Sequence, residues 1–313
     1  MAHKGLEEGK LPDLQVHFRK QNAQALSDDS EVNFFVRGKY ISKILNACCA
    51  KNAAKCLELC CGTGSLALEA ARRGADVTGI DISSEAIQIG QQYQGKILKH
   101  LTSGKVNLFV GDLNRIKLPQ REYDSVFVWD GLHHINNIDH LVSEVYKTLK
   151  DNAVFAVHDH VSPSTSKWKI IFATVTSEFL LLILPTSDDF STKIKPALSF
   201  IIKKLKRQST KRKRTKEVLT SPFEDVSGEN IINTIMGTFK ITELKRYSGG
   251  ISHRVAARLR PDCRCKFGLI RFVCTLDTLL ISLRILKPEY FFLIAHKKEE
   301  IHNSRLLQAT SRA

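Results

Sequence analysis

The chain has 313 residues, enough to bury a full hydrophobic core, and this length favours one large domain with an insertion over two equal domains. Its apolar share of 43% is ordinary, but its net charge of +15 indicates an anionic partner, such as nucleic acid, an acidic membrane surface or a phosphorylated substrate. The run at residues 203–216 holds nine lysines and arginines and no acid, so the remaining chain carries only +6 (15 − 9).

The composition also argues against several classes of protein. The first 15 residues hold no apolar stretch, so no signal peptide is expected. No stretch of about 20 apolar residues runs free of charge, so no segment is expected to cross a bilayer. The eight cysteines lack zinc-site spacing and are interpreted as buried thiols in a reducing compartment. A cytoplasmic protein is therefore expected, with peripheral attachment to a membrane left open.

Apolar periodicity predicts a regular alternation of helices and strands up to about residue 160. Gly74 ends one helical pattern and Ser84 is suited to cap the start of another. Short apolar strands that alternate with helices predict a parallel sheet covered on both faces. The predicted helices are 33–50, 65–73, 84–93 and 138–150, and the predicted strands are 55–60, 76–81, 106–110, 123–129 and 153–158.

The alternation stops after His160 and returns near residue 228. Helices at 228–236 and 267–286 and strands at 239–247 and 290–295 predict a last hairpin on one edge of the sheet. The expected fold is an α/β, Rossmann-like, mostly parallel seven-stranded sheet with helices on both faces and an inserted helical lid after strand five. The expected regions are a polar extension (1–32), the Rossmann-like core (33–162), the helical and basic lid (163–222), the C-terminal part of the fold (223–300) and a tail (301–313).

The strongest functional signal is the segment Leu-Glu-Leu-Cys-Cys-Gly-Thr-Gly at residues 57–64, between a predicted strand and a predicted helix. Gly62 and Gly64 allow a tight turn and a close approach of the backbone to a ligand. Asp81 ends the next predicted strand, where a carboxylate can accept hydrogen bonds from both ribose hydroxyls of an adenosine ligand. A lone Gly-x-Gly is common in turns, but this order of strand, acid, glycines, helix, strand and acid favours a nucleoside site.

Residues 56–83 resemble the first cofactor motif of the class I S-adenosylmethionine-dependent methyltransferases and the acid that follows it. Residues 111–113 and 123–134 are similar to later motifs of that superfamily, and the resemblance covers 33–160 well and 239–297 more loosely. It implies a methyltransferase that binds S-adenosyl-L-methionine and releases S-adenosylhomocysteine. The implied cofactor-binding residues are Glu58, Leu59, Cys60, Gly62, Gly64, Asp81, Ile82, Asp112, Leu113, Trp129 and Asp130.

Within this resemblance, Asp112 would read the adenine amino group, and the turn after the fourth strand would hold the methionine end of the cofactor. Arg37 or Tyr40 of the first helix would lie near the cofactor's carboxylate. The superfamily usually has glycine where Cys60 stands. A Rossmann dehydrogenase is the main alternative, but Glu58 and Asp112 are features of methyltransferases.

The candidate bases lie just after the fourth and fifth predicted strands, at the edge of an open sheet where ligands bind. Methyl transfer is a direct displacement, and an oxygen or carbon acceptor often needs a base as well. We expect at least one histidine of this cluster to act, with His134 and His160 preferred, although most of them could simply cap helices or support loops. The set is His133, His134, His158 and His160. A metal use of 158–160 is a weaker alternative, since only Asp159 offers a carboxylate, and no metal is expected.

Three interpretations of the acceptor remain. The apolar stretch within 170–182 favours a small or lipid-linked metabolite with an O-, N- or C-acceptor. The high charge and the basic run 203–216 favour RNA or another nucleic acid, although no Asn/Asp-Pro-Pro-Tyr signature follows the fourth strand. A basic methyltransferase-like scaffold, or a binder of anionic membrane surfaces through 170–216, is the third.

Overall fold

The computed structural model of the protein describes residues 30–51, 53–101, 104–161, 167–184, 228–256, 258–259 and 265–297. The basic run 203–216, the tail 301–313 and most of the predicted N-terminal extension lie outside these residues. The predicted lid is described at residues 167–184, which contain a helix.

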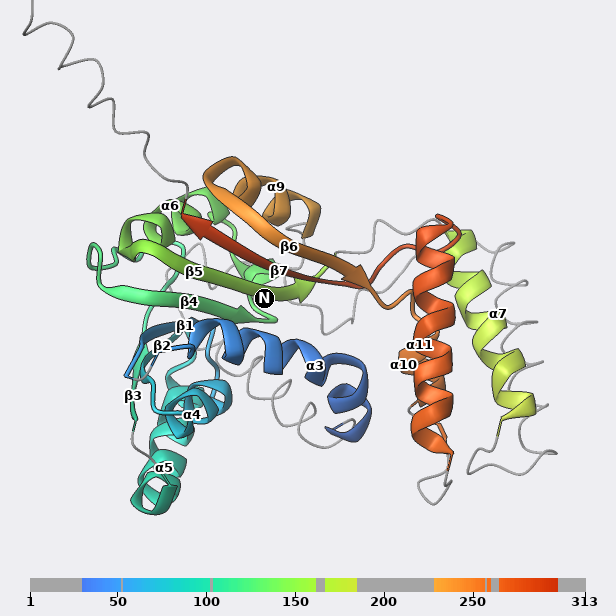
Figure 1. Ribbon diagram of the computed structural model, residues 1–313, viewed down its shortest axis with the longest axis horizontal. Helices are drawn as coiled ribbons and strands as arrows, with labels where there is room; N and C mark the ends of the chain where they lie inside the picture. The colour runs from blue at the N-terminus through green and yellow to red at the C-terminus, as the bar shows by residue number, and fades with distance from the viewer. Residues whose placement is uncertain are drawn as a thin grey trace, which may run out of the picture.

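A seven-stranded sheet forms the centre of the molecule, in the order β3-β2-β1-β4-β5-β7-β6 (Figure 1). Strands β1 to β5 run parallel to one another, and β7 pairs antiparallel with both β5 and β6. This confirms the predicted mostly parallel sheet and the antiparallel pair at one edge. The strands are β1 (Lys55–Leu59), β2 (Asp76–Asp81), β3 (Lys105–Val110), β4 (Tyr123–Trp129), β5 (Leu149–His160), β6 (Phe239–Tyr247) and β7 (Tyr290–Lys297).

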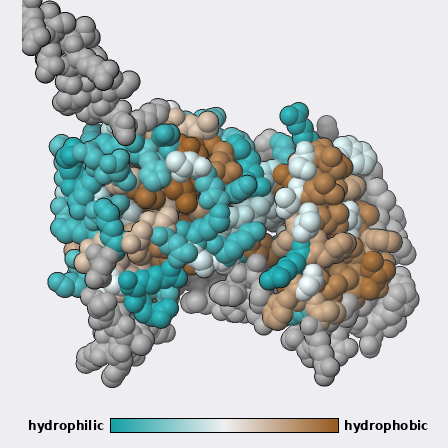
Figure 2. Space-filling model, in the orientation of Figure 1, coloured by the Kyte–Doolittle hydropathy of each residue, from teal (hydrophilic) through white to brown (hydrophobic). Residues whose placement is uncertain are grey.

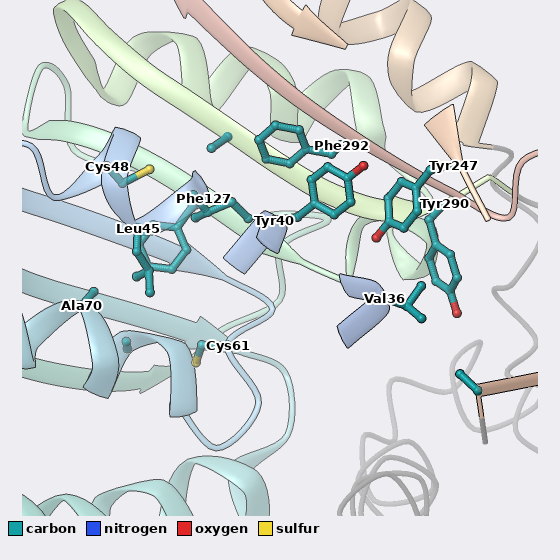
Figure 3. Close-up of a cluster of buried hydrophobic side chains, with 14 of the residues drawn as sticks. Val36, Tyr40, Leu45, Cys48, Cys61, Ala70, Phe127, Tyr247, Tyr290 and Phe292 are labelled. Atoms are coloured by element: carbon teal, nitrogen blue, oxygen red, sulfur yellow. The ribbon is translucent and has the colours of Figure 1, made fainter. Parts of the chain in front are cut away.

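Successive strand residues point to opposite faces of the sheet, and apolar residues occupy both sets, so helices cover both faces. One buried cluster joins α3, α4 and α5 to side chains such as Phe127 of β4. The other joins α6 and α9 to the opposite face, where Val126 and Val128 point. Figure 3 shows Tyr40 of α3 beside Phe292 of β7, with ring centroids 5.0 Å apart. The helices are α3 (Ser30–Cys48), α4 (Ser65–Arg72), α5 (Ser84–Leu101), α6 (Ile138–Thr148), α7 (Lys167–Ile183), α9 (Gly228–Thr238), α10 (Ser252–Ala256) and α11 (Lys266–Ser282), with a 3₁₀ turn η1 (Leu132–His134).

The fifth strand begins earlier than the sequence predicts. Strand β5 starts at Leu149, whereas the pair Asp151-Asn152 was expected to turn the chain into a strand starting at 153. Asn152 has φ of 58°, and asparagine tolerates this left-handed conformation, so the strand passes through the irregularity without ending. The pairing register with β4 shifts next to it, between Tyr123 and Ser125.

The helices α7, α10 and α11 pack together beyond the carboxyl end of β6 (Figure 1). Their shared core contains Ala173 and Leu181 of α7 together with Ile270 and Val273 of α11. Lys169 Nζ also donates to the carbonyl oxygen of Arg284 at 2.7 Å, which joins α7 to the segment after α11. No helix among the described residues is long and apolar enough to cross a membrane.

Candidate active site

The loop between β1 and α4 is a tight turn held against the end of β2. Its residues Cys60, Gly62 and Gly64 have φ of 55°, 54° and 73°, so three of five consecutive residues are left-handed. The Gly62 N–H donates to Asp81 Oδ2 at 2.7 Å, and the Cys61 N–H donates to the carbonyl oxygen of Ile80 at 3.1 Å. The two glycines adopt this conformation at little cost. The absent side chain of Gly64 also leaves room for Leu108, because a Cβ on Gly64 would lie 2.9 Å from Leu108 Cδ1.

Cys60 occupies a left-handed position where glycine is usual in the superfamily, and Gly131 makes room for its side chain. A Cβ placed on Gly131 would lie 2.2 Å from the Cys60 Cβ. The turn after β4 and the loop after β1 are therefore in direct contact. Any side chain at position 131 would push these two parts of the site apart.

Asp81 ends β2 and Asp112 lies two residues after the adjacent strand β3, so both stand at the carboxyl ends of the strands. Asp81 also accepts a hydrogen bond from the Ser83 N–H at 2.8 Å, and burial raises the pKa of its carboxyl while these backbone donors lower it. Asp112 accepts from the backbone N–H of Asn114 at 2.9 Å and from its amide at 3.0 Å. Both carboxylates are thus fixed in orientation by their own turns.

Glu58 lies inside β1 and is almost fully buried. Burial raises the pKa of its carboxyl to about 8, against the effect of the Ala67 N–H that donates to it. Gly64, the residue before α4, offers no side-chain cap, so Glu58 takes that role for the first turn of the helix. Glu58 therefore supports the loop from beneath. Its Oε2 has no hydrogen-bond partner within the described part of the chain.

A second network joins the end of β4 to α3. Asp130 has φ of 54°, and its carboxylate accepts from the guanidinium of Arg37 and from His158 Nδ1, the latter at 2.8 Å. The Arg37 guanidinium lies 4.9 Å from the ring centroid of Trp129, and the Trp129 ring stacks on His158 at 4.0 Å. The hydroxyl of Tyr247 lies 2.6 Å from His158 Nε2. Burial, reinforced by the charge of Arg37, holds the pKa of His158 well below its usual value, so this ring stays neutral.

Asp159 ties the turn after β4 to the end of β5. Its Oδ2 accepts from three successive backbone N–H groups, those of Gly131 (3.2 Å), Leu132 (2.6 Å) and His133 (3.3 Å). Its Oδ1 lies 2.5 Å from His133 Nδ1. The side chain is fully buried, which by itself would raise the pKa, but His133, the charge of His160 and the backbone donors lower it to about 2. The carboxylate is therefore ionised at neutral pH and fixes the tautomer of His133.

The structure brings three of the four candidate histidines into ring contact. His133 lies with its ring centroid 3.9 Å from that of His134 and 5.1 Å from that of His160. His158 instead bonds to Asp130 and Tyr247. Burial lowers the pKa of His160 to about 3. No group of three or more potential metal ligands was found among the described residues, 158–160 included.

Comparisons with known proteins identify methyltransferases as similar to this chain. Residues 56–152 match the family model described as a methyltransferase domain. A 2-phytyl-1,4-naphtoquinone methyltransferase from a Nostoc species is 24% identical over 198 residues, which cover 62% of this chain and 82% of that protein. A demethylmenaquinone methyltransferase from Listeria welshimeri is 22% identical over 200 residues, 63% of this chain and 79% of that protein.

A solved structure from Galdieria sulphuraria, thought to be a sarcosine dimethylglycine methyltransferase, superposes with a TM-score of 0.50. It is 14% identical and covers 84% of this chain and 86% of that one, which supports the fold. The methyltransferase domain matched over residues 56–152 and the similarity to named methyltransferases show that this chain is an S-adenosylmethionine-dependent methyltransferase. Its 3-2-1-4-5-7-6 sheet has the fold of the class I enzymes, and the dehydrogenase alternative is set aside.

Several residues of the site could not be recognised in the sequence. Gly131 lies in the matched segment 123–134, but its contact with Cys60 is not visible there. Tyr247 carries no motif, because its importance lies in its contact with His158. The sequence marks Asp159 only as the single acid between His158 and His160, and it gives no sign of the hydrogen bonds that Asp159 accepts. Arg37 was expected near the cofactor's carboxylate, and in the structure it donates a hydrogen bond to Asp130. Tyr40, the other residue expected there, stacks on Tyr247. A role toward the cofactor stays a prediction for both residues.

The contact between α5 and the glycine loop generates a prediction. A Cβ at Gly90 of α5 would lie 2.4 Å from the carbonyl oxygen of Thr63, so Gly90→Ala must displace the loop. We expect the affinity for S-adenosylmethionine, measured by calorimetry, to fall by about tenfold or more. Gly268→Ala is the matched control, because nothing lies within 4 Å of its Cβ on α11. Unchanged affinity in Gly90→Ala would show that the loop's position does not matter for binding.

The partly buried His160 predicts a pH-dependent stability. Its folded pKa of about 3 lies below the unfolded value of about 6.5, so the unfolded chain binds this proton first as the pH falls. The free energy of unfolding should therefore decrease from about pH 6.5 toward pH 3. Between pH 7.5 and pH 5, we expect the free energy of unfolding of His160→Gln to fall by roughly 2 kcal/mol less than that of the parent protein. Urea unfolding of both proteins at these two pH values measures the difference, and equal losses would contradict it.

Proposed function

We propose that the protein methylates an apolar, lipid-linked ring compound that carries a hydroxyl group, such as a prenylated hydroquinone. The observation that carries this proposal is the similarity to two methyltransferases named for naphtoquinone and menaquinone substrates, over more than three fifths of this chain. The nucleic-acid interpretation depended on the high charge and the basic run 203–216, and the run lies outside the described residues. No observation on the described residues favours it or a non-catalytic scaffold.

The cofactor would lie across the carboxyl ends of β1 to β4. The glycine turn at Gly62 and Gly64 would take its amino-acid and sugar portions, and Asp81 would accept hydrogen bonds from the ribose hydroxyls. Asp112, two residues after β3, is placed for the adenine amino group. Bound S-adenosylmethionine supplies an electrophilic methyl group on a sulfonium sulfur. The remaining proposed contacts are Glu58, Leu59, Cys60, Ile82, Leu113, Trp129 and Asp130.

His133 is the residue best placed to accept the proton of the acceptor. Because Nδ1 donates to the ionised Asp159, the lone pair of the ring lies on Nε2. This nitrogen would take the proton of the acceptor hydroxyl, and the hydroxyl oxygen would take the methyl group that S-adenosylmethionine supplies when bound. Asp159 then stabilises the imidazolium, the role that a buried aspartate has beside a catalytic histidine. His134 and His160, the two histidines preferred from the sequence, remain alternatives within ring contact.

The cofactor site is tested with Asp81→Asn. We expect the parent protein to bind S-adenosylmethionine and S-adenosylhomocysteine at micromolar strength, and the variant to bind at least about tenfold more weakly, because one acceptor oxygen becomes a donor. Titration calorimetry measures both affinities. Glu122→Gln is the control, since this carboxylate pairs with Lys55 at the opposite, amino end of β1. Absence of binding in the parent, or full binding in Asp81→Asn, would contradict the proposed site.

The base is tested by comparing His133→Asn, His134→Asn and His160→Asn with a short-chain prenylated naphthohydroquinone as acceptor. We expect His133→Asn to lower kcat by about 10²–10⁴-fold while the affinity for the cofactor stays the same. Its rate should recover in part as the pH is raised, because the ring hydroxyl then ionises without help. A retained rate in His133→Asn would rule out this base, and a loss confined to another variant would assign the role there.

A further inference from the structure

Helix α7 exposes a row of large apolar side chains. Residues three or four positions apart lie on one face of a helix, and this row follows that spacing along the whole helix. Trp168 is 71% exposed and Phe179 is 63% exposed, which is unusual for side chains of this size. The opposite face, with Ala173 and Leu181, packs into the shared core of the three helices. The exposed row is Trp168, Phe172, Val175, Phe179 and Ile183.

Helix α11 and the residue that follows it present a second row. Phe272, Leu279 and Leu283 are exposed and are spaced by seven and four residues, so they also share one face. The two helices are joined through their shared core and through the Lys169–Arg284 hydrogen bond. Figure 2 shows apolar residues gathered over α11 and α7, in contrast to the hydrophilic surface over the sheet. We refer to the two rows together as the apolar helical surface.

The charges around this surface are almost all positive. The described residues of 167–184, 252–259 and 265–287 include eight lysines and arginines and two acids. Neither acid is exposed: Glu178 is partly buried and pairs with Arg258 at 3.0 Å, and Asp277 is buried. Arg271 and Arg284, in contrast, are exposed beside the apolar rows. A partner of this surface must therefore be both apolar and negatively charged.

The apolar helical surface adjoins the edge of the sheet that carries the site. Helix α7 follows β5 after a short connection, and β5 ends at His160. Helix α11 leads into β7, whose first residue Tyr290 pairs with His160. Both helices thus attach next to the residues proposed to receive the acceptor.

We propose that the apolar helical surface docks onto the surface of an anionic lipid membrane. This deepens the proposed function, on which it rests, because a lipid-linked acceptor would then enter from the bilayer beside the site. Soluble monomers rarely expose apolar patches of this kind, and aromatic side chains flanked by cations are the features of helices that lie in a membrane interface. A second copy of the chain, or the chain's own basic run 203–216, carries the same sign of charge as this surface, whereas anionic lipid carries the opposite sign.

The test uses the full chain and sedimentation with vesicles. We expect binding to phosphatidylcholine vesicles containing about 30% phosphatidylserine, and at least tenfold weaker binding to phosphatidylcholine alone. The triple variant Trp168→Ser, Phe172→Ser, Phe179→Ser should lose at least about tenfold in affinity for the anionic vesicles. Phe109→Ser is the matched control, because Phe109 is 54% exposed on β3 at the other end of the sheet. The control should bind as the parent does.

Three results would overturn the proposal. They are no binding of the parent to anionic vesicles, equal binding of the triple variant, or a triple variant that melts several degrees lower, which would mean that the surface is covered within the protein. A parent that forms dimers lost in the triple variant would assign the surface to a second copy. Titration with S-adenosylmethionine and turnover of a short-chain soluble acceptor are measured on the same variant. These readouts distinguish a failure of membrane docking from a failure of the proposed chemistry.

Discussion

The buried carboxylate of Asp159 is the interaction on which the acceptor side of the site depends. It accepts three backbone N–H groups from the turn after β4 and a fourth hydrogen bond from His133, so one ionised group defines both the path of the turn and the tautomer of the histidine. Without it, the turn would bury donors with no acceptor, which is costly in a protein interior. The same carboxylate therefore satisfies the backbone through one oxygen and orients His133, the proposed base, through the other.

Gly131 joins this acceptor side to the cofactor side. Its N–H bonds to Asp159, while its missing side chain leaves the space that Cys60 of the glycine loop fills. On the other flank, Arg37 reaches from α3 to Asp130 and packs between the rings of Trp129 and Tyr290. The two parts of the site are thus built from the ends of different strands and held at a fixed separation by packing and short hydrogen bonds. Direct displacement requires such a fixed separation between donor and acceptor.

The sequence predicted the strands and most helices well, because the period of apolar residues is a local signal. It also predicted that Asp81, Asp112 and the histidines would gather at one edge, since the carboxyl ends of parallel strands meet there. It did not separate the histidines. His133 differs from His134 only through its contact with Asp159, 26 residues away, and neither spacing nor residue type reveals that contact. The sequence predicts only a helical lid at α7 and a helix at α11, because apolarity alone does not tell which face of a helix is covered.

The position of β7 has a consequence for how the molecule is made. This strand is the last described element of the chain, yet it lies between β5 and β6 and supplies both with hydrogen-bond partners. During synthesis on the ribosome, β5 presents an unpaired edge until residues 290–297 have emerged, and such edges invite association with other chains. Tyr290, whose ring lies 4.5 Å from that of His160, arrives at the same moment. The nascent protein must therefore remain without a finished acceptor site until almost the whole of its described length has been translated.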